Sequence, residues 1–237
     1  MKIFVLKGIL YLIPSPLGDN DPKEVIPDSV MELIPTLKHF VVEEVKTARR
    51  YLTKMGLKGK IDTLRFYELN EHTKINDIEG YINVLLEGEN VGLISEAGLP
   101  AVADPGSSLV ELAHINGIDV KPMVGPSSLM MALMSSGKNG QSFAFTGYLP
   151  VKPDERRAKI KLLEKISLCQ YQSQIIIETP YRNNSLLADL LLVCAPKTKL
   201  CIAADISLST AYIKTKTIEQ WRKEKIDLNK KPCVFIL

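Results

Sequence analysis

The 237-residue sequence has few cysteines and histidines, and they are not spaced as in metal sites or C-x-x-C motifs. Its four cysteines include no pair at C-x-x-C spacing, and its three histidines are scattered, so neither set has the pattern of a zinc site. We therefore expect no metal ion. Cys194, Cys201 and Cys233 lie in apolar runs, which is typical of reduced, buried cysteines.

Long hydrophobic runs are also missing. No apolar stretch reaches the roughly 18 residues that a membrane span requires, and Lys7 and the sequence PSP at 14–16 interrupt the apolar start of the chain. Neither sign of charge dominates, since the chain has 30 basic and 27 acidic residues. The lack of long apolar runs leads us to expect a cytoplasmic protein. The nearly balanced charge permits a nucleic-acid partner without requiring one.

Several common cofactor and catalytic fingerprints are absent. No G-x-G-x-x-G follows the first expected strand, so a dinucleotide site is not indicated. The sequence SSGK at 135–138 lacks the first glycine of a P-loop, and GPSSL at 125–129 lacks the last glycine of a G-x-S-x-G turn. These patterns give no support to nucleoside triphosphatase or serine hydrolase chemistry.

The sequence does contain a regular alternation of apolar, β-rich runs and helical patterns, which predicts an α/β fold. A chain of this length accommodates two α/β lobes, which we place at residues 1–122 and 123–237. Strands are expected at 8–13, 40–43, 63–68, 91–94, 119–124, 143–149, 175–178, 200–204 and 233–237. Helices are expected at 25–37, 44–55, 75–86, 107–116, 127–135, 154–166 and 182–193.

Three loops that follow expected strands have unusual composition. They are PSPLGD at 14–19, the stretch 95–106 with SEAGLP and DPG, and VGPSS at 124–128. Ligands of α/β sheets bind where loops leave the carboxyl ends of strands, and proline and glycine shape such loops for close backbone approach. Two serines in the third loop precede a helix, where they either cap it or help to bind an anion.

These loops carry a resemblance to a known family. The chain resembles the tetrapyrrole (corrin/porphyrin) methylase superfamily, and more closely its branch of bacterial small-subunit rRNA ribose 2′-O-methyltransferases. The motifs are LYLIPSPLG at 10–18, ISEAGLP at 94–100 with DPG at 104–106, VGPSS at 124–128, FTGYLP at 145–150 with two arginines at 156–157, and ETPYR at 178–182. Together they span nearly the whole chain.

The resemblance implies two α/β lobes with S-adenosylmethionine folded into the cleft between them, and it implies a homodimer. Motif by motif, it points to nine residues at the cofactor: Pro16, Leu17, Gly18, Ser95, Glu96, Ala97, Gly98, Ser127 and Ser128. A sulfonium is cationic, so nearby carboxylates would favour its binding, which makes Glu96 a candidate for this role and adds Asp104 to the predicted cofactor residues.

The motifs that face the substrate in this family have drifted. VEEVK stands at 42–46 where the rRNA branch usually has AEDTR, and Lys46 cannot reproduce a bidentate guanidinium contact. YELNE at 67–71 keeps only part of an H-x-H-N-E element, and Ala204 replaces an arginine. The accepting substrate is therefore open between ribosomal RNA and a tetrapyrrole-like or other small molecule, and a cofactor-binding homologue without turnover is a further alternative.

Transfer to a ribose hydroxyl requires a nucleophile in line with the methyl group and a general base within hydrogen-bond reach. The carboxylates that we would test as bases are Glu44, Glu178 and Asp205, although each could instead be exposed or a helix cap. Basic residues that could hold RNA phosphates are Arg156, Arg157 and Arg182, although a solvated helix face explains them equally well. The function predicted from sequence is S-adenosylmethionine-dependent methyl transfer, with rRNA as the first candidate substrate.

Overall fold

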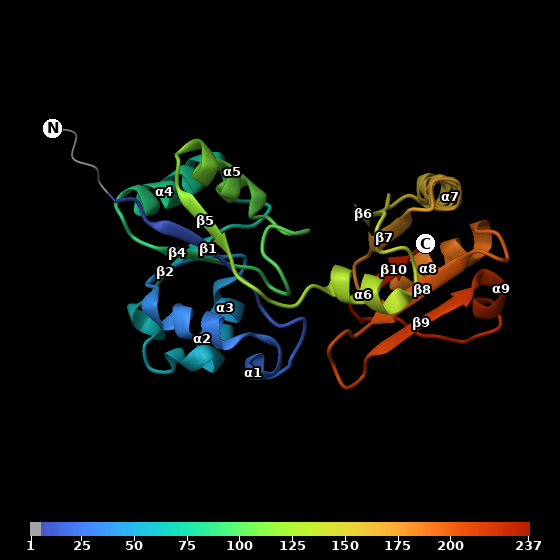
Figure 1. The fold of residues 1–237 in the computed structure, drawn as a ribbon, viewed down its shortest axis with the longest axis horizontal. Helices are drawn as coiled ribbons and strands as arrows, with labels where there is room; N and C mark the ends of the chain where they lie inside the picture. Colours follow the sequence, from blue (N-terminus) through green and yellow to red (C-terminus); the bar gives the residue numbers. More distant parts are fainter. Residues whose placement is uncertain (1–5) are drawn as a thin grey trace. The chain divides into compact units, whose positions relative to one another are not determined.

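The structure, a computed structural model, describes residues 6–237 and divides into two units, Met1–Ser127 and Ser128–Leu237. Each unit has one five-stranded sheet with helices packed against it (Figure 1). The α/β fold expected from the sequence is confirmed.

The sheet of unit 1 is parallel throughout, in the order β3-β2-β4-β1-β5. Its strands are β1 (Ile9–Ile13), β2 (His39–Val42), β3 (Arg65–Glu68), β4 (Val91–Ile94) and β5 (Asp119–Pro122). Ile94 pairs with Ile13 on one side and with Val42 on the other, so three strands end level with one another. The loops that follow them therefore leave the same edge of the sheet.

Helices cover both faces of this sheet (Figure 1). One face carries α1 (Pro22–Val25), α2 (Asp28–Leu33) and α3 (Val45–Leu52), and the other carries α4 (Ile75–Leu86) and α5 (Ser107–Ile115). Burial on both faces explains why β4 is an unbroken apolar run rather than an alternating one.

One long helix was expected at 25–37, and this prediction is wrong. The segment forms α1, α2 and a 3₁₀ turn at Ile34–Thr36. Pro27 is the N-cap of α2, and Pro35 lies inside the 3₁₀ turn. Proline lacks the amide proton of a helix interior and disfavours helical geometry in the residue before it, so the two prolines divide the segment.

Unit 2 has a mixed sheet in the order β6-β7-β10-β8-β9. Its strands are β6 (Phe143–Tyr148), β7 (Ser173–Ile177), β8 (Lys199–Ala204), β9 (Tyr212–Thr217) and β10 (Cys233–Ile236), and its helices are α6 (Ser128–Ser136), α7 (Pro153–Gln170), α8 (Asn183–Val193) and α9 (Ile218–Trp221). Only β6 and β7 are parallel. Trp221 is buried in the core, and its Nε1 donates to the Leu200 carbonyl at 2.9 Å.

Two elements of unit 2, β9 and α9, were not expected from the sequence. β9 reads YIKTKT, in which lysines alternate with apolar or hydroxyl side chains because the strand lies at the sheet edge. Across residues 6–237, no helix has the length and apolar character needed to span a membrane.

Candidate cofactor site

The first two of the three loops are joined by backbone hydrogen bonds at the carboxyl edge of the unit 1 sheet. The Ser15 amide donates to the Gly98 carbonyl at 2.9 Å, and the Gly98 amide donates back to the Ser15 carbonyl at 3.0 Å. The Ser15 hydroxyl donates to the Ser95 carbonyl at 2.7 Å. The 14–19 and 95–106 loops thus form one surface.

The third loop packs closely against the first. A Cβ atom on Gly125 would lie 2.2 Å from Cβ of Pro14, so only glycine permits this approach. Gly98 has a positive φ of 79°, and a Cβ there would lie 3.2 Å from the Leu17 side chain and 3.5 Å from the Pro126 carbonyl. The three loops therefore meet at this edge through residues of unit 1.

Side chains of helix α3 contact the surface that these loops form. The Tyr51 hydroxyl, which is buried, donates to the Pro14 carbonyl at 2.8 Å. Thr47, one turn earlier, lies near the Glu96 carboxyl and partly opposes the rise in pKa that burial causes there. Neither residue was predicted from the sequence, because contacts between residues as far apart as Tyr51 and Pro14 leave no local signal.

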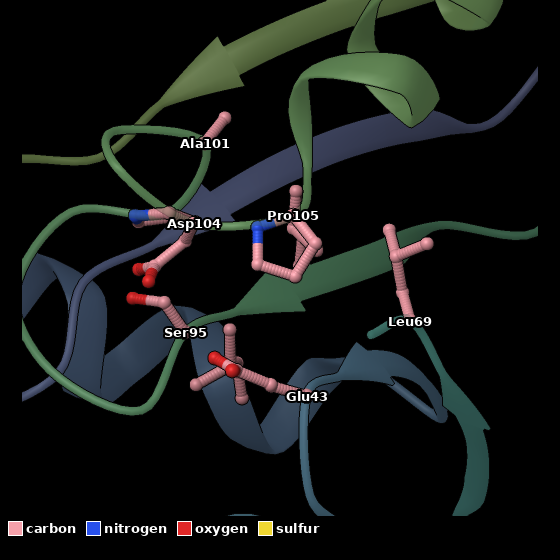
Figure 2. A pocket seen from close by; sticks show the side chains of 9 residues that line it. Glu43, Leu69, Ser95, Ala101, Asp104 and Pro105 are labelled. Atoms are coloured by element: carbon pink, nitrogen blue, oxygen red, sulfur yellow. The ribbon is translucent and has the colours of Figure 1, made fainter. Parts of the chain in front are cut away.

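A small pocket opens beside the 95–106 loop (Figure 2). It is a shallow pocket, and its lining consists of Glu43, Leu69, Leu93, Ile94, Ser95, Pro100, Ala101, Asp104 and Pro105. The backbone of this loop is strained, since Ala101 and Ala103 have positive φ values of 63° and 64°. Such strain in non-glycine residues is held in place by surrounding structure and is concentrated at functional sites.

The carboxyl groups at the pocket favour positive charge nearby. Burial, and secondly Glu43, raise the pKa of Asp104 to about 6, against the opposing effect of the Ser95 hydroxyl. Burial, and secondly Glu43, also raise the pKa of Glu96. Burial, and secondly Glu71, raise the pKa of Glu43. A cation bound here would relieve this mutual repulsion.

Ser95 supplies an unused polar atom at the same place. Its side chain is 7% exposed, and its hydroxyl points toward the Asp104 carboxylate (Figure 2). Its Oγ is near enough to lower the Asp104 pKa, but it completes no full hydrogen bond with any residue that the structure describes. A buried hydroxyl without a partner is destabilising, so it is suited to a ligand.

The predicted cofactor residues are distributed as follows. Nine belong to the joined loops of unit 1: Pro16, Leu17, Gly18, Ser95, Glu96, Ala97, Gly98, Asp104 and Ser127. Ser128 is the first residue of α6 in unit 2. Glu43 was not among the predictions, although its place directly after β2 could have revealed it by the same strand-end rule. In the described part of the chain, no group of three or more ligating side chains is arranged to hold a metal.

Each of the three predicted bases has a partner. The Glu44 carboxylate caps α3 by accepting from the Lys46 and Thr47 amides at 2.9 and 2.8 Å. The hydrogen bond from the Thr47 hydroxyl is the main cause that lowers the pKa of Glu44, which makes it a weak base. In unit 2, the remaining two are held in ion pairs: Glu178 with Arg182 at 2.7 Å, and Asp205 with Lys231 at 3.5 Å.

Arg156, which was predicted to bind substrate, is buried in an ion pair. Its side chain is 7% exposed, and its guanidinium pairs with Asp189 at 2.5 Å and donates to the Val151 carbonyl at 3.0 Å. Arg157 shares the same carboxylate at 2.7 Å. The pair of arginines therefore joins α7 to α8, and the notion of a solvated basic face fails for Arg156.

Solved structures define the class of fold. The methyltransferase CobJ superposes with a TM-score of 0.64 at 15% identity, covering 97% of this chain and 93% of that chain. Uroporphyrin-III C-methyl transferase from Thermus thermophilus, complexed with S-adenyl homocysteine, gives 0.57 at 14%, covering 97% and 96%. The chain has the two-unit α/β fold of the tetrapyrrole-methylase type.

Curated relatives place the chain within that class, although no protein-family model matches it. Proteins named ribosomal RNA small subunit methyltransferase I include one from Neisseria meningitidis serogroup B, 32% identical over 86% of this chain, and one from Escherichia coli O157:H7, 26% identical over 98%. The matches span 65% and 78% of those proteins, so the first falls short of two thirds of its relative. The chain is a homologue of these proteins, which confirms the resemblance that its loop motifs indicated.

Proposed function

We propose that this chain is an S-adenosylmethionine-dependent methyltransferase that acts on a ribose hydroxyl of small-subunit ribosomal RNA. The observation that carries the proposal is the meeting of three loops at the carboxyl edge of the unit 1 sheet, where the 95–106 loop also lines an acidic pocket. The names of the relatives support rRNA as the substrate.

The hydroxyl and carboxyl groups of these loops suit S-adenosylmethionine. S-adenosylmethionine would supply a methyl group on a cationic sulfonium. The Ser95 hydroxyl offers the cofactor a hydrogen bond, and Gly98 and Gly125 allow the three loops to pack closely against one another. Asp104 and Glu96 attract the positive charge, and binding of a cation would return the Asp104 pKa toward its ordinary value.

Because the three predicted bases are held by other groups, we favour a mechanism that relies on placing the nucleophile in line with the methyl group rather than on a carboxylate base. Glu44 is a helix cap, and Glu178 and Asp205 lie in ion pairs, so none of them offers a carboxylate without a competing partner. The same observation favours a second candidate, a homologue that binds the cofactor without turnover. Ala204, where the rRNA branch has arginine, favours a third, transfer to a small-molecule acceptor.

The deciding experiment combines two measurements. Ribose methylation of small-subunit rRNA is mapped in a strain that lacks the gene, and purified protein is then given that rRNA with methyl-labelled S-adenosylmethionine. We expect one site to lose its methyl group in the deletion strain and to regain it in vitro. An unchanged map would remove rRNA as the substrate, and cofactor binding with no labelled product would support the form without turnover.

We also propose that the protein is a cytoplasmic homodimer. Large apolar side chains are exposed on α6 and on the edge strand β6, including Met134 at 82% and Phe143 at 39%. Burial of such side chains against a second copy would stabilise association. Light scattering of the purified protein should give twice the chain mass, and a monomer at micromolar concentration would contradict the dimer.

A further inference from the structure

A strongly charged surface of unit 1 lies outside the pocket. We call residues 45–65 the basic surface. This segment holds seven of the chain's 30 basic residues and one of its 27 acidic residues, so the rest of the chain is net negative. All seven basic residues are exposed: Lys46, Arg49, Arg50, Lys54, Lys58, Lys60 and Arg65.

Helix α3 and the turn after it place part of this charge on one side. Lys46, Arg50 and Lys54 follow one another at intervals of four, opposite the buried face that contains Tyr51 and Leu52. Like charges four positions apart repel each other and destabilise a helix. The spacing of these three charges therefore does not serve the stability of α3, whose cap and buried face stabilise it, and a negatively charged ligand would relieve the repulsion.

Little within the basic surface neutralises it. Its one acidic residue, Asp62, pairs with Arg49, whose guanidinium carbon also lies 6.0 Å from the centroid of the Phe66 ring. Gly56 and Gly59 have no atom within 4 Å of the place where a Cβ would lie, so a ligand can approach the backbone there. None of the large, exposed apolar side chains of the protein falls within residues 45–65, all of which the structure describes.

The basic surface begins at the pocket. Glu43 lines the pocket, and Glu44 caps α3 through the amide of Lys46, the first basic residue of the segment. A ligand that follows α3 from this end therefore starts beside the candidate cofactor site within the same unit.

We propose that the basic surface binds the phosphate backbone of the RNA substrate and orients it at the pocket. This inference rests on the proposed function. Phosphate contacts position a nucleic acid without reading its sequence, and lysine and arginine side chains among small polar residues are suited to them. A protein partner would instead need buried aromatic or apolar anchors, which this surface lacks over residues 45–65.

The test uses the full chain and unmodified small-subunit rRNA transcribed in vitro, with binding measured over a range of salt concentrations. The test variant changes three lysines of the basic surface: Lys54→Gln, Lys58→Gln and Lys60→Gln. The matched control changes three exposed lysines of unit 2: Lys161→Gln, Lys223→Gln and Lys225→Gln. Both variants lose the same charge. Calorimetry with S-adenosylmethionine is run on every protein.

We expect the test variant to bind RNA roughly 10- to 100-fold more weakly near physiological salt, with a salt slope lower by about 2 to 3. The control should change by less than about twofold, and cofactor binding and thermal stability should be unchanged in both. Equal RNA affinity in the two variants would overturn the proposal. A loss of binding to phosphatidylserine vesicles with RNA binding intact would also overturn it and assign the surface to anionic membranes. Failure of the unmodified protein to bind the cofactor would instead count against the proposed function.

Discussion

Replacing Asp104 with asparagine should stabilise the ligand-free protein at pH 8. Burial, and secondly Glu43, raise the pKa of this carboxyl from 3.8 to about 6. The folded protein then binds the proton more tightly than the unfolded chain does, so stability falls as the pH rises from about 4 through 6. The rise in pKa corresponds to about 3 kcal/mol, which solvent screening of this partly exposed side chain reduces to about 1–1.5 kcal/mol.

The assay is chemical denaturation at pH 8 and at pH 4, read by hydrogen exchange of the β4 amides. Trp221 is the single tryptophan and lies in unit 2, so its fluorescence provides an internal control that should not shift. Asp104→Asn should gain about 1–1.5 kcal/mol at pH 8 and nothing at pH 4. An asparagine variant that is less stable at pH 8 would refute the reasoning.

The ionisation of Asp104 should affect cofactor affinity in the opposite direction to stability: a rise in pH should strengthen cofactor binding. A cation prefers the ionised form of Asp104, so affinity for S-adenosylmethionine should rise between pH 5 and pH 7.5 in the unmodified protein. Asp104→Asn should flatten that dependence and bind more weakly at the higher pH. Calorimetry across this range checks both statements, and a steep pH dependence in the variant would assign the effect to another group.

Two further predictions test the packing. Gly125→Ala should separate two loops, because its Cβ would lie 2.2 Å from a proline side chain. We expect at least about tenfold weaker cofactor binding and a loss of about 1–3 kcal/mol in the free energy of unfolding. The control Gly80→Ala lies in open space on α4 and should be neutral or stabilising. Asp189→Ala should destabilise unit 2 by about 3–5 kcal/mol because Arg156 stays buried without its partner, whereas Asp154→Ala, at an exposed pair, should change stability by less than about 1 kcal/mol. Calorimetric unfolding measures these differences, and equal losses within either pair would contradict the reasoning.

Much of the fold follows from local signals. α4 matches the expected helix at 75–86, and β4 matches the expected strand at 91–94, since apolar periodicity and flanking turns define both. The segment at 25–37 failed because two prolines outweigh its helical periodicity. β9 was missed because its pairing with β8 stabilises a lysine-containing strand that has no apolar face of its own.

The candidate site was predictable only in part. Its loops could be placed because parallel strands send their following loops to one edge, and the sequence marks those loops with proline and glycine. The contact of Tyr51 with Pro14 and the burial of Arg156 against Asp189 depend on residues that are far apart in sequence. The roles of Glu44, Glu178 and Asp205 in catalysis stay predictions, because their hydrogen bonds and ion pairs supply a structural reason for each carboxylate.

The most direct test of the central claim is calorimetric titration of the purified protein with S-adenosylmethionine and with S-adenosylhomocysteine. The three joined loops, one of which lines the acidic pocket with Ser95, predict saturable binding of one ligand per chain, weakened by Gly125→Ala and retained in the Gly80→Ala control. Absence of heat for both ligands at millimolar concentration, from protein that unfolds cooperatively, would contradict the account.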